Sequence, residues 1–112
     1  MAEFSKVAAD RRKEPRARVT LQGRYMLANR NEYPCTVIDA SASAIALSCP
    51  ERGAIGEAVV LYIDHFGRLE GNVVRHVEDG FVVKFQQKSR AAQAIAKLVD
   101  GHPSAERRAG VV

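Results

Sequence analysis

The chain has 112 residues, of which 46% are hydrophobic and 27% charged, and these totals suit one small domain with a single core. No stretch approaches the roughly 20 consecutive apolar residues of a membrane-spanning helix, so membrane insertion is not expected. The N-terminal segment MAEFSKVAADRR lacks the apolar centre of a secretory signal. Two cysteines, Cys35 and Cys49, stand in separate segments without CxxC spacing, which predicts reduced thiols in a cytoplasmic protein.

The net charge of +4 is unevenly distributed along the chain. Residues 1–30 contain eight Lys or Arg and three acidic residues, a net charge of +5, whereas residues 31–112 contain nine and ten, a net charge of −1. The whole positive excess therefore lies near the N-terminus, which favours an anionic partner for that end. Proteins that bind long nucleic acids usually spread their cations over a face, so nucleic acid is not the expected partner.

Six short β-strands follow the N-terminal segment. Apolar and polar residues alternate from Arg18 to Leu27, which is the pattern of a half-buried strand. Five more strands are expected, in meander order, at residues 33–40, 44–48, 57–64, 68–77 and 81–87. The Pro- and Gly-rich residues 50–56 predict a loop, Glu78-Asp79-Gly80 predicts a hairpin turn, and Gly71 predicts a bulge or bend.

One helix is expected after the strands, at residues 89–100. Ser89 is a suitable N-cap and Gly101 a suitable stop, and apolar residues recur on one face between them. Six short strands cannot safely leave two edges exposed, so we expect them to close. The predicted fold is all-β: a small six-stranded antiparallel β-barrel with one C-terminal helix over one end.

The first candidate site is the cationic stretch DRRKEPRARV, residues 10–19. Pro15 disfavours a helix there and extends the chain, so that Arg12 and Arg16 can point at a common target. The forked donors of arginine pair well with phosphate oxygens and with the O6/N7 edge of guanine. Charge runs near chain ends are also commonly solvated arms, and the charge pattern alone leaves both interpretations open.

The second candidate site is DASASAIAL, residues 39–47, at the junction of two predicted strands. Asp39 and Ser41 supply acceptor oxygens, and a carboxylate can accept hydrogen bonds from the N1–H and N2–H₂ groups of guanine. In the alternative interpretation, both side chains belong to an ordinary turn and bond only to nearby backbone.

The two candidates together resemble the PilZ domain, a family of bacterial receptors for cyclic di-GMP. An R-x-x-x-R pair, Arg12 and Arg16, lies just before the first strand, and a D-x-S element, Asp39 and Ser41, follows the second. Strand number and the final helix agree with that family from about residue 11 to residue 100. The resemblance thus implies a PilZ-like barrel with its helix at 11–100. The residue pattern outside this range predicts a flexible segment at 1–10 and a disordered tail at 101–112.

The resemblance also implies roles for individual residues. In PilZ domains the arginines of R-x-x-x-R clamp guanine and phosphate, which implies that role for Arg12 and Arg16. The D-x-S residues contact a guanine from the barrel surface, which implies that role for Asp39 and Ser41. An arginine directly before the first motif accompanies binding of two stacked ligand molecules, and Arg11 occupies that position.

One residue departs from the family pattern. The family motif is D/N-x-S-x-x-G, and its final place is Ala44 in this chain. A glycine there permits either a positive φ or a close approach of the ligand to the backbone. If the position requires a positive φ, the methyl group costs on the order of 1 kcal/mol and weakens binding several-fold. If the methyl meets the base directly, the cost is larger.

The expected function is that of a receptor without enzymatic activity. The three histidines have no metal-ligand spacing, and nothing resembles a nucleophile elbow, so neither a catalytic site, a metal nor a cofactor is expected. We expect the ligand to be cyclic di-GMP and the output to be contact with an unidentified protein effector, through ordering of the N-terminal segment. Two alternatives are an adaptor that has lost the nucleotide and a basic barrel for single-stranded RNA, although the strands lack the row of exposed aromatics that stacks bases.

Overall fold

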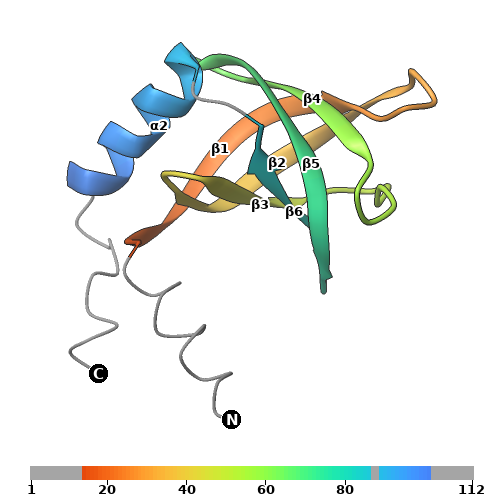
Figure 1. Cartoon of the computed structure of the whole chain (residues 1–112), viewed down its shortest axis with the longest axis horizontal. Coiled ribbons are helices and arrows are strands. Elements are labelled where there is room, and N and C mark those ends of the chain that lie inside the picture. The colour runs from red at the N-terminus through yellow and green to blue at the C-terminus, as the bar shows by residue number, and fades with distance from the viewer. Residues whose placement is uncertain (1–13, 87–88, 102–112) are drawn as a thin grey trace, which may run out of the picture.

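Six antiparallel strands close into a barrel in the computed structural model, which describes residues 14–86 and 89–101 (Figure 1). The strands are β1 (Arg16–Met26), β2 (Glu32–Ser41), β3 (Ala44–Ser48), β4 (Ala58–Ile63), β5 (Gly67–Val77) and β6 (Gly80–Phe85). The helix, α2 (Arg90–Gly101), follows them. The predicted fold class, a small all-β barrel with one C-terminal helix, is confirmed.

The order of the strands around the barrel differs from the expected meander. The order is β1-β2-β3-β6-β5-β4. Strand β4 therefore pairs with β1 and β5, and it does not pair with β3, the strand before it in the chain. Closure comes from pairing of Gly23–Met26 in β1 with Val60–Ile63 in β4. The meander prediction was wrong because both edges of the short strand β3 are occupied, by β2 and β6, and the chain must cross to the other side before β4 begins.

The loop that makes this crossing is held by hydrogen bonds to the barrel and within the loop itself. The buried Tyr25 hydroxyl donates to the Glu51 carbonyl at 2.5 Å and accepts from the Glu51 amide at 3.1 Å. The Glu57 carboxylate accepts from the Ala28 and Ala54 amides, both at 2.8 Å, and these bonds lower the pKa of Glu57. Such contacts replace the ladder hydrogen bonds that an irregular segment lacks.

The core lies inside the barrel and continues under the helix. Alternate residues of β1 point inward as the sequence pattern predicts, and Tyr25, near the end of the strand, packs edge-on against Phe81. Both cysteines are free thiols; burial raises the pKa of Cys35 to about 12 and also raises that of the half-buried Cys49.

Helix α2 packs against β2 and β5 (Figure 1). The Ser89 hydroxyl accepts from the Ala92 amide at 3.1 Å, so the predicted N-cap is confirmed. Four apolar residues of the helix join the core: Ala91, Ala92, Ile95 and Val99. In the part of the chain that the structure describes, no helix is both long and apolar enough to cross a membrane.

Gly71 serves close packing, and the bulge expected there lies three residues later. The β5–β6 register is regular from Gly71 to Val73, and the extra residue is Val74. A methyl group on Gly71 would collide with the Lys84 carbonyl oxygen and the Val83 side chain, so the small residue allows β6 to approach.

Replacing Gly71 with alanine should therefore destabilise the barrel by about 1–3 kcal/mol, the usual range for forced overpacking. Gly101→Ala is the matched control, because a methyl group there meets nothing within 4 Å. Urea denaturation of the two variants measures the difference. If Gly71→Ala is as stable as Gly101→Ala, then β5 and β6 do not need the close approach at Gly71.

Candidate functional site

A groove of about 590 Å³ lies on the outer wall of the barrel, over β1, β2, β3, β6 and β5. Its lining includes four of the six residues that the sequence assigns to a binding site: Arg16, Asp39, Ser41 and Ala44. The other two, Arg11 and Arg12, lie outside the described residues. The fold therefore brings the start of β1 and the β2–β3 junction together in one concave surface.

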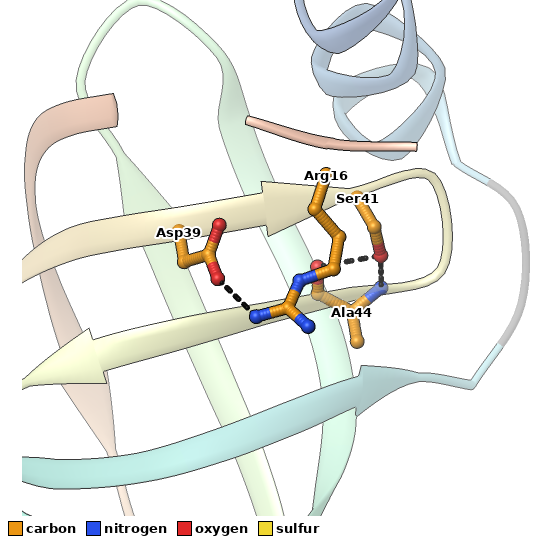
Figure 2. A network of polar contacts seen from close by, with 4 residues as sticks. All are labelled: Arg16, Asp39, Ser41 and Ala44. Carbon is orange, nitrogen blue, oxygen red and sulfur yellow. Dashed lines mark hydrogen bonds and ion pairs between the residues drawn. The ribbon is translucent and has the colours of Figure 1, made fainter. Parts of the chain in front are cut away.

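The most direct link between the two motifs is an ion pair. Arg16 Nη2 lies 2.7 Å from Asp39 Oδ2, and Figure 2 shows the guanidinium reaching across the strands to the carboxylate. In the sheet, Arg16 is the partner of Ser41, while Asp39 is the partner of Arg18, so the pair is diagonal. The two side chains are 58% and 24% exposed, which keeps both accessible to a ligand.

Ser41 shapes the turn that follows β2. Its buried hydroxyl accepts from the amides of Ser43 at 3.3 Å and Ala44 at 3.1 Å, and it lies 3.2 Å from the Ala44 carbonyl, to which it donates (Figure 2). The ordinary-turn interpretation thus describes the contacts of Ser41, whereas Asp39 pairs across the sheet. Ser41 fixes the backbone beside the groove.

Ala44 begins β3 with ordinary strand geometry. Among the described residues, only Arg30 and His65 have a positive φ without being glycine. The methyl group of Ala44 therefore causes no left-handed strain, and of the two expected effects of this residue only the steric one remains. Ala44 lines the groove, and its cross-strand partner is Lys84 on β6.

Glu14 connects the chain before β1 to the same turn. Its carboxylate accepts from the Ser43 hydroxyl at 2.7 Å, and Glu14 lines the groove. This bond holds Glu14 against the β2–β3 turn. No sequence pattern assigns a role to Glu14, because a contact between positions 29 residues apart leaves no local pattern.

The groove carries more positive than negative charge. Its lining contains four cationic residues and two acidic ones: Arg16, Arg18, Arg75 and Lys84, with Glu14 and Asp39. The excess favours an anionic ligand. From the sequence pattern, Arg18 is expected to be surface charge, Arg75 is expected either to be exposed at a strand end or to add charge to the ligand face, and Lys84 has no predicted role. Their convergence depends on strand order, which the sequence pattern did not reveal.

The PilZ domain model matches residues 10–101 of this sequence, which is most of the chain. The chain belongs to the PilZ domain family. Among solved structures, this PilZ domain is similar to the Bacillus subtilis inhibitor of motility (MotI/DgrA), with a TM-score of 0.60 and 18% sequence identity. The similarity covers 78% of this chain and 48% of the other, so this chain spans about half the length of that one. No curated protein matches the sequence.

Ser41→Ala should lower the free energy of unfolding by about 1–2 kcal/mol, because two amides of the turn lose their acceptor. Ser48→Ala is a suitable control, since the Ser48 side chain forms no hydrogen bond with the described residues. Thermal and urea unfolding report the loss. Equal stability of the two variants would contradict the structural role of the Ser41 hydroxyl.

Proposed function

We propose that this PilZ domain binds cyclic di-GMP in the groove and relays the signal to a protein partner, without catalysing a reaction. The observation that carries the proposal is the placement of Arg16 and Asp39 side by side in a groove with excess positive charge. Membership of the PilZ family supports the choice of ligand. The ligand is a dianion with two guanine bases, so it needs both cationic donors and acceptors for guanine.

Arg16 and Asp39 complement different edges of a guanine. The guanidinium donates to the O6/N7 edge or to a phosphate oxygen, and the carboxylate accepts from N1–H and N2–H₂. In the structure the two groups satisfy each other at 2.7 Å. An exposed pair of this kind contributes only about 0.2–1 kcal/mol, so its opening opposes ligand entry little.

Arg12 and Arg11 complete the proposed site from the chain before Glu14. Two extended residues span at most roughly 7 Å and three roughly 11 Å, so both arginines can reach a ligand beside Glu14. We assign Arg12 to the phosphate and guanine clamp with Arg16. Arg11 is assigned to a second, stacked ligand molecule, which makes an intercalated dimer the proposed stoichiometry.

The proposed output is a change in the surface around the N-terminal segment. When Arg11 and Arg12 contact the ligand, the segment that carries them is ordered against the barrel, and a partner protein recognises the new surface. A ligand can shift this equilibrium only through contacts that it makes in the ordered state, and the two arginines supply them.

A nucleotide-free adaptor is the second candidate function, and Ala44 is the observation in its favour. The methyl group occupies space in the groove where the family motif has glycine. If it excludes the ligand, the barrel acts through protein contacts alone.

Calorimetric titration with cyclic di-GMP separates these two functions. We expect the wild type to bind and Arg16→Ala to bind at least tenfold more weakly, because a hydrogen bond to a charged group contributes about 1.5–3 kcal/mol. Ala44→Gly should bind more tightly than the wild type, since it removes the steric obstacle.

Arg68→Ala is the matched control for that titration. It also breaks an exposed ion pair, with Glu70, but Arg68 does not line the groove, so its affinity should equal that of the wild type. Absence of binding by both the wild type and Ala44→Gly would select the adaptor.

Hydrogen exchange of residues 5–18 tests the proposed output. Saturating cyclic di-GMP should slow exchange in this segment, because ordering protects amides, and exchange in β4 should stay unchanged. The same experiment on Arg12→Ala should show a smaller effect. Identical exchange in residues 5–18 with and without ligand would exclude the ordering mechanism.

A further inference from the structure

Three strands contain an extra residue where they border the groove. Arg18 and Leu21 of β1 pair with Asp39 and Val37 of β2, so β1 has two residues between these pairs where β2 has one. β2 has one extra residue, Ile38, relative to β3, and β5 has one, Val74, relative to β6. A bulge of this kind bends the strand and redirects side chains, so it can turn residues of one strand toward a binding surface.

The extra residues in β2 and β5 lie at the two ends of an apolar surface in the groove. Ile38 is 36% exposed and Val74 is 42% exposed, and they are two of the four exposed large hydrophobic residues in the described part of the chain. Both line the groove, together with Ala46 and Val82. Single exposed apolar residues are ordinary, but a group of them beside cations suits the flat face of a nucleobase.

A row of cross-strand partners connects this surface to the arginines of β1. The row runs across five strands and consists of Arg18, Asp39, Ala46, Val82 and Arg75. Four strand intervals of about 4.8 Å make the row roughly 19 Å long when measured along the wall. Its two ends are cationic, so one anionic ligand can be held from both sides.

Arg75 and Lys84 are available for such a contact. Both line the groove, and within residues 14–86 and 89–101 neither side chain forms a hydrogen bond or an ion pair. Arg75 directly follows the extra residue Val74, which places it beside the apolar surface.

We propose that this side of the groove holds the half of the cyclic dinucleotide remote from Arg16. Its base packs on the apolar surface between Ile38 and Val74, over Ala46 and Val82, and Arg75 and Lys84 donate to its phosphate. The inference rests on the proposed function and adds residues that neither arginine motif nor D-x-S turn contains. It also explains why apolar residues are exposed between cations in this chain.

The test is calorimetric titration of cyclic di-GMP into Arg75→Gln and Ile38→Ser. Arg75→Gln should weaken binding about tenfold or more, since it removes a charged donor. Ile38→Ser should weaken binding about threefold to tenfold through lost apolar contact, and because it changes no charge, a long-range field cannot account for the effect.

Arg68→Gln serves as the control with the same chemical change outside the groove, and its affinity should equal that of the wild type. Both test positions are exposed, and unfolding midpoints verify that the variants are folded. If the wild type binds and Arg16→Ala weakens binding, but Arg75→Gln or Ile38→Ser binds as the wild type does, this inference alone is wrong. If the wild type does not bind, both the inference and the proposed function are wrong.

Discussion

A small sheet closes into a barrel only if its strands curve, and in this chain β1 must pair with β2 and β4 at once. Extra residues in β1, β2 and β5 interrupt the regular register on one side of the barrel. Ile38 and Val74 are exposed at two of these interruptions, and Arg75 directly follows Val74. Curvature needed for closure and the lining of the groove therefore have a common structural origin.

In the proposed site, the ion pair between Arg16 and Asp39 joins the two sequence motifs in the absence of a ligand. It contributes little to stability because the pair is open to solvent, with Asp39 partly buried, but it holds a cation and an acceptor at the groove, 2.7 Å apart. Ser41 stabilises the turn beside them, and Glu14 brings the preceding chain to that turn. A dinucleotide would replace one internal contact with several of its own, which is the requirement for a reversible receptor.

Local features of the fold followed from the sequence because they depend on local physics. Alternation in β1, the hairpin at Glu78-Asp79 and the Ser89 N-cap each involve residues close in the chain. The strand order did not follow, since it depends on which edges are free after β3 has paired. The motif residues Arg16 and Asp39 could be expected to meet. The sequence pattern left Arg75 as either an exposed residue or added charge on the ligand face, and it gave no sign of Lys84, because both placements depend on strand order. A residue such as Ile38 is extra only relative to the strand it pairs with, so the pattern of one strand alone does not reveal it.

Amide chemical shifts of the ¹⁵N-labelled protein, followed during titration with cyclic di-GMP, test the central claim most directly. If one ligand site spans the groove, the amides of Asp39, Ala44, Arg75 and Lys84 should shift together with a common saturation curve. The amide of Tyr62, on the opposite wall in β4, should stay in place. No shifts at saturating ligand, or shifts confined to the wall around Tyr62, would contradict the account.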